Sequence, residues 1–324
     1  MKKRYLHYIS ALLLSANVYA APSAYQAPLA AKSLLLDVVR ADSGLVAVGE
    51  RGHILLSVNG DNWQQAEVPT TATLTAVTFI DQQGWAVGHD SIILHTADSG
   101  HHWQVQQYLP ELEQPLMDVL FVNAMQGIAV GAYGNYFRTE DGGEHWQKEL
   151  HPEFLMAEDR EYLEDIKAQD PDYYEEAIAG MLPHLNRLSF DGSRLYLAGE
   201  AGLLAYSDDL GKSWQRMEID YNGSFFDVRK AEDGQVYAAG LRGHLFRLDG
   251  QTWQEIESGT QASLNSIVPL SSTETLAVGN NGMIVTIQGD KVTASQEKDG
   301  KAIVDGVSVN GRLLAVTATG IKQF

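Results

Sequence analysis

The stretch TEDGGEHW, Thr139–Trp146, places carboxylates and a histidine beside a glycine pair and a tryptophan. Such a combination suits a metal site, a catalytic loop or a tight turn with an aromatic plug. It recurs as TADSGHHW (Thr96–Trp103) and SDDLGKSW (Ser207–Trp214), and in trimmed form as SVNGDNW (Ser57–Trp63) and RLDGQTW (Arg247–Trp253). A catalytic site would occur once, so the recurrence indicates a structural repeat.

Two further motifs recur at the same spacing as this turn. One is AVGERG at Ala47, with relatives that start at Ala86, Ala129, Leu197, Ala238, Ala277 and Ala315, and the other is a short apolar opening such as LMDV at Leu116. Their spacing is about 40 residues with one longer step, and each unit alternates β-branched or aromatic runs with turn residues. In the second unit the expected strands are 74–80, 84–87, 92–95 and 103–107. Four short strands per unit over seven units predict an all-β, seven-bladed β-propeller.

The last unit has room for only three strands before Phe324. We expect Ser23–Ala30 to supply the missing outer strand and so to join the two ends of the ring. Residues 21–324 are expected to form a single propeller domain.

The repeated turn has a structural explanation for each of its residues. The aspartate accepts hydrogen bonds from turn amides, the glycine adopts a positive φ, and the tryptophan packs between blades. The Ser or Thr ties the turn together. In the three complete copies these structural residues are Thr96, Asp98, Gly100 and Trp103; Thr139, Asp141, Gly143 and Trp146; and Ser207, Asp209, Gly211 and Trp214. No catalytic residue, metal ligand or cofactor is expected.

The N-terminus predicts export. Lys2, Lys3 and Arg4 precede a mostly apolar run that is too short to span a membrane, and the small residues Val18 and Ala20 predict cleavage after Ala20. Residues 1–20 are thus a predicted signal peptide, and the mature protein is expected in the periplasm or outside the cell, without membrane insertion and as a monomer. The chain carries 42 acidic against 23 basic residues and no cysteine. This charge disfavours nucleic-acid binding, and the core alone must stabilise the fold.

The turns are Asp-box (BNR) motifs, and sialidases carry similar boxes. Sialidases, however, usually have six blades and an FRIP-like segment that is absent here, and no carboxylate pair is marked. A glycan-binding or sialidase-like glycoside hydrolase propeller is therefore the alternative function. The chain more closely resembles the photosystem II stability/assembly-factor-like propellers over Leu35–Phe324, because those proteins combine seven blades, AVG-x-x-G hairpins and Asp boxes with tryptophan.

That resemblance implies a non-enzymatic scaffold, assembly or accessory factor for a membrane-protein complex of the envelope. Photosynthetic members look like assembly chaperones with a basic surface, which this acidic chain does not match. Non-photosynthetic members look like exported accessory proteins, often of resistance-nodulation-division (RND) type exporters.

Strand direction alternates within a blade, so the turns fall on two faces. The AVG-x-x-G turns lie opposite the Asp boxes, and their polar residues differ from blade to blade as the residues of a binding face would. The candidate partner-binding residues there are Glu50, Arg51, His89, Asp90, Tyr133, Asn135, Glu200, Arg242 and Asn280.

The longer step between units comes from an acidic insertion, residues 151–184, between blades 3 and 4. Helical spacing over 158–169 and a proline at 171 predict a helical hairpin. The hairpin is either a solvated lid over the channel or a partner-docking element with Tyr162, Tyr173 and Tyr174 as contacts. In both cases we expect the ring to close without it.

The opening motifs place Asp37, Asp118, Asp227 and Asp305 at one position and Arg187 in a fifth blade. If these residues face the axis, the carboxylates could hold a cation. The alternative, which repetition favours, is that each aspartate bonds backbone amides of the neighbouring blade.

Overall fold

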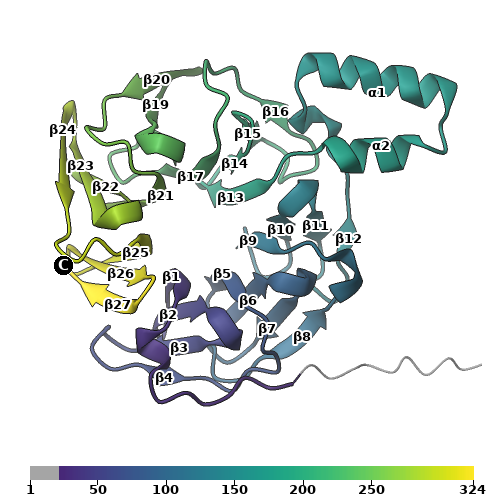
Figure 1. Cartoon of the computed structure of the whole chain (residues 1–324). Coiled ribbons are helices and arrows are strands. Elements are labelled where there is room, and N and C mark those ends of the chain that lie inside the picture. Colours follow the sequence, from purple (N-terminus) through teal and green to yellow (C-terminus); the bar gives the residue numbers. More distant parts are fainter. Residues whose placement is uncertain (1–21) are drawn as a thin grey trace, which may run out of the picture.

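The computed structural model describes residues 22–324, whose strands form seven antiparallel sheets arranged as the blades of a ring (Figure 1). Six sheets have four strands and the seventh has three. The seven-bladed β-propeller predicted from the repeats is therefore confirmed. The predicted signal peptide lies outside the described residues.

In the first four blades each sheet runs from an inner strand to an outer strand in chain order. The strands are β1 (Leu35–Ala41), β2 (Gly44–Gly49), β3 (Ile54–Ser57) and β4 (Gln64–Gln65); β5 (Leu74–Ile80), β6 (Gln83–Gly88), β7 (Ile93–Thr96) and β8 (Gln104–Gln107); β9 (Leu116–Phe121), β10 (Gly127–Gly131), β11 (Tyr136–Thr139) and β12 (Gln147–Lys148); and β13 (Leu185–Phe190), β14 (Leu195–Gly199), β15 (Leu204–Ser207) and β16 (Gln215–Arg216).

The last three blades continue the pattern until the final sheet. Their strands are β17 (Phe225–Lys230), β18 (Val236–Gly240), β19 (Leu245–Asp249) and β20 (Thr252–Ile256); β21 (Leu264–Ser271), β22 (Glu274–Gly279), β23 (Met283–Gln288) and β24 (Lys291–Gln296); and β25 (Ile303–Val309), β26 (Arg312–Thr317) and β27 (Gly320–Gln323).

The second strand of each blade explains the AVG motif. Strands β10, β14 and β18 are buried along their whole length. Such strands are covered by a neighbouring blade on each face, so they read as continuous runs of small and apolar residues rather than as an alternation. The core consists accordingly of apolar clusters between blades. Trp85 of blade 2, for example, stacks on Phe121 of blade 3 with ring centroids 3.4 Å apart.

The insertion forms two α-helices, α1 (Ala157–Gln169) and α2 (Tyr174–Met181), as the sequence predicted. They lie outside the ring, beside the outer strands of blades 3 and 4, so the interpretation as a lid over the channel is wrong (Figure 1). Among the described residues no helix is long and apolar enough to cross a membrane. Short 3-10 helices occupy eight turns and links: η1 (Ala30–Lys32), η2 (Glu50–Gly52), η3 (His89–Ser91), η4 (Pro110–Leu112), η5 (Ala132–Gly134), η6 (Pro152–Phe154), η7 (Leu241–Gly243) and η8 (Asn280–Gly282).

The expected closing strand does not form. Ser23–Ala27 runs along the outer side of blade 1, where the Ala24 amide donates to the Val68 carbonyl at 2.8 Å and the Ala27 amide to Gln65 Oε1 at 2.8 Å. In the part of the chain that the structure describes, blade 7 therefore has three strands. The prediction was wrong because it rested on the number of strands alone. The sequence does not show that Gln65 and Val68 hydrogen-bond this segment instead.

Candidate functional site

The aspartates around the axis of the ring have a structural role. Each axis aspartate accepts a hydrogen bond from a backbone amide of the following blade: Asp37 from Val77 at 2.8 Å, Asp118 from Leu188 at 2.6 Å, Asp227 from Ile267 at 2.8 Å, and Asp305 from Val38 at 3.2 Å. The last of these bonds joins blade 7 to blade 1. Of the two hypotheses for these carboxylates, the geometry supports the structural one.

Two arginines share the axis with the aspartates. Arg187 Nη1 lies 3.6 Å from Asp37 Oδ1 and 3.7 Å from Asp118 Oδ1, and Arg229 Nη2 lies 3.5 Å from Asp227 Oδ2. Burial raises the pKa of Asp118 to about 6 although Arg187 opposes the shift. Burial and then the neighbouring Asp305 carboxylate raise the pKa of Asp37 well above its usual range. The axis is thus a dense, desolvated charge network that ties blades together.

The Asp boxes have the structure that the sequence predicted. In the copy that begins at Thr139, the Thr139 hydroxyl donates to Asp141 Oδ1 at 2.8 Å and accepts from the Gly143 amide at 2.9 Å, while Asp141 Oδ1 also accepts from the His145 amide at 3.0 Å. The boxes at Thr96 and Ser207 repeat these bonds. Three copies of one bonding pattern identify the box as a turn motif.

The tryptophans of the boxes are not equally buried. Trp103 and Trp214 are buried between blades, but Trp146 is only partly buried, against Phe121 and Gln106. Trp146 differs because Phe121 stacks on Trp85, so that the space between blades 2 and 3 is already filled.

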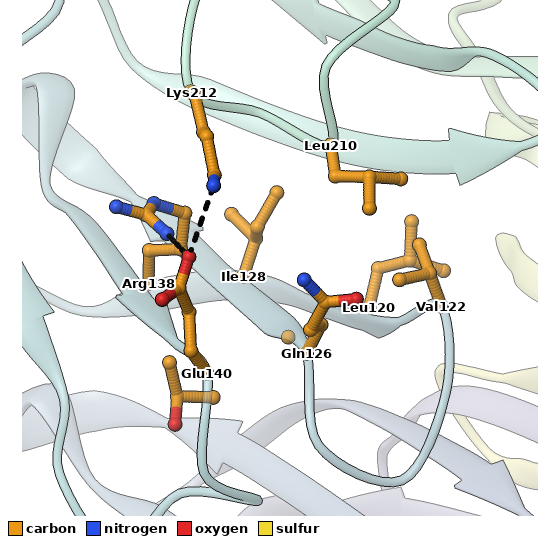
Figure 2. A pocket seen from close by; sticks show the side chains of 10 residues that line it. Leu120, Val122, Gln126, Ile128, Arg138, Glu140, Leu210 and Lys212 are labelled. Carbon is orange, nitrogen blue, oxygen red and sulfur yellow. Dashed lines mark hydrogen bonds and ion pairs between the residues drawn. The ribbon is translucent and has the colours of Figure 1, made fainter.

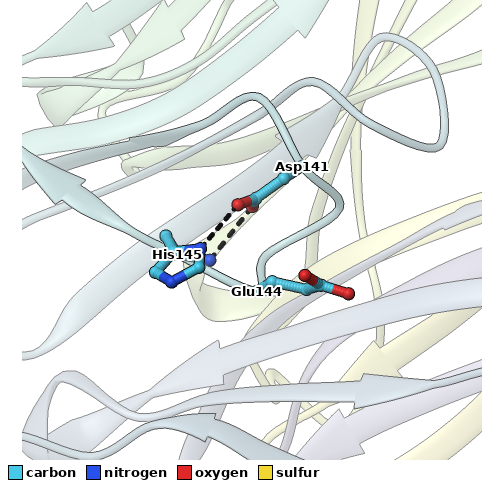
Figure 3. A group of neighbouring side chains, drawn as sticks. All are labelled: Asp141, Glu144 and His145. Atoms are coloured by element: carbon cyan, nitrogen blue, oxygen red, sulfur yellow. Dashed lines mark hydrogen bonds and ion pairs between the residues drawn. The ribbon is translucent and has the colours of Figure 1, made fainter.

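One Asp box also brings three ionisable side chains together. Asp141, Glu144 and His145 are the one such group of metal-binding type found in residues 22–324 (Figure 3). Both Asp141 oxygens already accept hydrogen bonds, Oδ1 from the turn and Oδ2 from His145 Nδ1 at 2.7 Å. The His145 amide and ring hold the pKa of Asp141 at about 2. The group therefore serves the turn.

The same face carries a crevice between blades 3 and 4, floored by Leu120, Ile128 and Leu210 (Figure 2). Its volume of about 10 Å³ leaves no room for a ligand. Glu140 closes its rim, with one carboxylate oxygen 2.7 Å from Arg138 Nη1 and 3.3 Å from Lys212 Nζ. The Asp-box face is sealed at this seam.

The opposite face, which we call the second face, carries the AVG-x-x-G turns. In six blades the middle residue of this turn has a positive φ between 53° and 60°: Arg51, Asp90, Tyr133, Ala201, Arg242 and Asn281. A left-handed backbone favours glycine and costs other residues about 1 kcal/mol each. The turn backbone is therefore constant while its outward side chain changes from blade to blade.

The proposed partner-binding residues of the second face differ in accessibility. Arg51, His89, Tyr133, Arg242 and Asn280 are exposed, whereas Glu50, Asp90 and Glu200 are partly buried. Asn135 is buried, and its Nδ2 donates to Ser91 Oγ of blade 2 at 3.0 Å. Its side chain therefore joins two blades and is not presented on the surface.

The insertion is part of the core as well as of the surface. Phe154, Leu155, Leu163, Ile178 and Leu182 are buried in one cluster with side chains of blades 3 and 4. The Gly134 amide donates to the Pro183 carbonyl at 2.9 Å, so the end of the hairpin rests on the second face. The insertion therefore contributes to the core, and the expectation that the ring closes without it stays a prediction that a deletion variant tests.

The hairpin presents aromatic side chains to solvent. Tyr162 and Tyr173 are 59% and 48% exposed, while Tyr174 packs partly on the core with Lys167 4.9 Å from its ring centre. Tyr133, 56% exposed, lies on the turn against which the hairpin packs, edge-on to His184 at 4.5 Å. Exposed tyrosines of this kind are common anchors of protein interfaces.

A groove of about 480 Å³ runs between the start of α1 and the outer strand of blade 4. Sequence reasoning missed the residues that line it, among them Met156, Arg160, Arg216 and Tyr221. Arg216 is held in place by two carbonyls, with Nη1 2.6 Å from Phe154 O and Nη2 2.6 Å from Ala201 O. The one available signal was Arg160, one of two basic residues in the acidic insertion.

A family model, the photosynthesis system II assembly factor YCF48, matches residues 17–112 and 104–224. The chain belongs to this family. The photosystem II assembly protein Ycf48 of Synechococcus sp. (strain JA-2-3B'a(2-13)) is 44% identical over 54 residues, which are 16% of each chain. That of Synechococcus sp. (strain JA-3-3Ab) is 38% identical over 66 residues, 19% of this chain and 20% of the relative. The alignments thus span a fifth or less of either relative.

Solved structures agree with the fold along most of the chain. A structure described as YCF48 bound to D1 peptide has a TM-score of 0.66 at 16% identity, covering 93% of this chain and 95% of that one. YCF48 from Cyanidioschyzon merolae gives 0.66 at 14% identity, covering 93% and 98%. The propeller domain of Cps50 (Swd1) from Myceliophteria thermophila reaches 0.67 at 11% identity, covering 90% and 97%. Likeness at this level shows the propeller and leaves function to be argued from the surface.

Proposed function

We propose that the protein is an exported, non-enzymatic scaffold that holds a membrane protein of the cell envelope during assembly or operation of its complex. The observation that carries this proposal is the second face. Six turns share one backbone, yet the residue in the left-handed position is basic, acidic, aromatic, small or an amide. Framework alone would favour glycine there, so the variety suits a surface that recognises a partner.

The insertion supports the same role. It is anchored in the core between blades 3 and 4, which fixes its position, and its helices expose Tyr162 and Tyr173. A rigid aromatic surface loses little conformational entropy when it binds. We propose that the partner contacts Tyr133 and the hairpin together.

The class of partner follows from the family and from charge. One family member has been solved with a bound D1 peptide, so we propose that this chain also binds a segment of a membrane protein. Because the chain is acidic overall, its partner surface should be basic, and binding should weaken as salt rises. An RND-type exporter is our proposed partner within the envelope.

Export is part of the proposal and has its own test. If residues 1–20 are a signal peptide, protein recovered from the periplasm or the medium should begin at Ala21. N-terminal sequencing checks this, and recovery of the intact Met1 chain from the cytosol would contradict it.

The scaffold role is tested by recovery of a partner. Tagged protein purified from detergent-solubilised envelope should carry a membrane protein in a fixed ratio, identified by mass spectrometry. The double variant Tyr133→Ser/Tyr173→Ser should lose it, while Met125→Ser, which alters an equally exposed side chain on the Asp-box face, should retain it. Equal recovery with both variants would contradict the proposed surface. Turnover of a sialoside by the purified protein would contradict the non-enzymatic role.

A further inference from the structure

Within residues 22–324, blade 7 is one strand short. Its sheet is β25-β26-β27, whereas every other blade has a fourth, outer strand. In blades 1, 3 and 4 that outer strand is only two residues long, so a short segment is enough to complete a blade. In Figure 1, β27 lies at the rim of the ring with no strand outside it.

The outer edge of β27 offers backbone groups for pairing. The Phe324 amide donates to Leu313 O of β26 at 2.9 Å, so this amide points inward. Backbone groups alternate in direction along a strand, so Ile321 and Gln323 turn theirs to the outer edge. Among the described residues, η1 lies against Gly320 at the start of β27, and Ser23–Ala27 bonds blade 1. Neither segment pairs with this edge.

The neighbouring blades limit which polypeptide can pair with the outer edge of β27. The neighbouring blades both have their outer strands, β24 and β4, so the edge of β27 is recessed by one strand spacing, about 4.8 Å. A groove of about 660 Å³ opens at the C-terminal end of β27, lined by Asn59, Asp61, Val309, Arg312, Leu314 and Phe324. A recess one strand wide admits a single extended chain and excludes the sheet edge of a second folded copy.

We propose that blade 7 binds an extended, basic segment of a partner polypeptide as its fourth strand. Affinity would come from main-chain hydrogen bonds to Ile321 and Gln323, and selectivity from the groove beside them. The basic character follows from the charge of the chain, 42 acidic against 23 basic residues. This site is distinct from the second face and stands whether or not the scaffold role holds.

The test uses a defined probe, a fluorescent acetylated hexapeptide of alternating lysine and valine, followed by anisotropy. Gln323→Pro removes the outward amide, and proline is tolerated on edge strands. Gln323→Ala is the matched control, because both variants lose the bond from Gln323 Nε2 to Gly60 O. We expect the proline variant to bind at least tenfold more weakly than the alanine variant at an unchanged melting temperature. Equal binding by the two variants, or no binding by wild type, would overturn the proposal.

A second variant keeps the test decisive if proline perturbs the fold. Appending Asn-Gly and a copy of Lys291–Gln296 after Phe324 would supply a fourth strand in cis. This chain should melt at a higher temperature and lose the probe. An unchanged melting temperature with full probe binding would overturn the proposal. So would a dimer abolished by Gln323→Pro, or probe binding that appears only after residues 1–21 are removed, since the occupant would then be this chain itself.

Discussion

The seam between blades 3 and 4 and the seam between blades 7 and 1 solve the same packing problem in different ways. At the first seam the chain adds residues: Phe154, Leu163 and Ile178 of the insertion are buried, and the Trp214 indole donates to the Tyr136 hydroxyl at 3.2 Å. At the second seam the two ends of the described chain meet, and the segment before β1 adds only the small side chains Ala27, Ala30 and Ala31 to the apolar cluster. Asp305 bonds the Val38 amide, and Arg40 Nη2 donates to Ser308 O at 2.9 Å.

The difference shows which interactions stabilise each of the two seams. The insertion at the seam of blades 3 and 4 is anchored in the core and exposes tyrosines. The closing seam combines the axis network with small side chains, and within residues 22–324 it leaves the edge of β27 unpaired. Loss of buried apolar contact should therefore damage the first seam most, and loss of charge should damage the second.

The largest effect should come from removing the insertion. Deleting Glu153–Pro183 behind a Gly-Ser bridge strips five buried apolar side chains from the core, each worth about 2–5 kcal/mol. That loss matches or exceeds the usual stability of a domain, about 5–15 kcal/mol. We expect no cooperative melting by circular dichroism. A deletion protein that melts within about 5 °C of wild type would show that the two seams are alike.

The next effect should appear at the closing seam. Asp305→Ala leaves the Val38 amide, the Ser266 hydroxyl and nearby arginines without their acceptor, and should destabilise by about 3–5 kcal/mol in urea unfolding. Asp299→Ala is the control, since its ion pair with Lys322 is solvent-exposed and should contribute little to stability. Similar losses in both variants would mean that the axis does not close the ring.

The box tryptophans sharpen the comparison between seams. Trp214 is buried at the seam of blades 3 and 4, so Trp214→Ala should cost about 3–5 kcal/mol of unfolding free energy. Trp146 is partly buried between blades 2 and 3, and Trp146→Ala should cost about half as much. Equal losses would mean that the motif, and not the packing at each seam, sets the contribution.

The smallest effect concerns pH. Burial raises the pKa of Asp118 from 3.8 to about 6, so this carboxyl favours the folded state while protonated. Its contribution is fully present below pH 3.8 and is lost as the pH rises through about 6. Relative to Asp118→Asn, wild type should lose about 2 kcal/mol between about pH 4 and pH 7, since one pKa unit corresponds to about 1.4 kcal/mol. A difference that is constant with pH would mean that Asp118 is ionised throughout.

Much of this structure could be predicted from the sequence repeats. Leu74–Ile80, the box bonds of Thr139 and Asp141, and the turn at Tyr133 all follow from local motifs whose geometry is set by neighbours in sequence. The axis aspartates could be placed from register alone, but their Arg187 contact could not, because it depends on side chains from distant blades.

What the sequence did not predict lies outside the repeat. The ten acidic residues of the insertion predict a solvated or partner-docking hairpin at the surface. Leu163 and Ile178 are nevertheless buried in the core. Ser23–Ala30 was predicted to be the closing strand because the last repeat has room for only three strands. Part of this segment instead hydrogen-bonds to Gln65 and Val68 on the outer side of blade 1. Both outcomes depend on tertiary partners that no local pattern records.

The most direct test of the central claim compares the two faces by photo-crosslinking. A photoreactive phenylalanine is placed at Tyr133 on the second face or at Met125 on the Asp-box face, positions that are 56% and 53% exposed. After irradiation of intact cells, we expect the Tyr133 variant to crosslink to one membrane protein, with no matching product from the Met125 variant. Crosslinks of equal yield from both positions, or from Met125 alone, would contradict a scaffold that binds its partner through the second face.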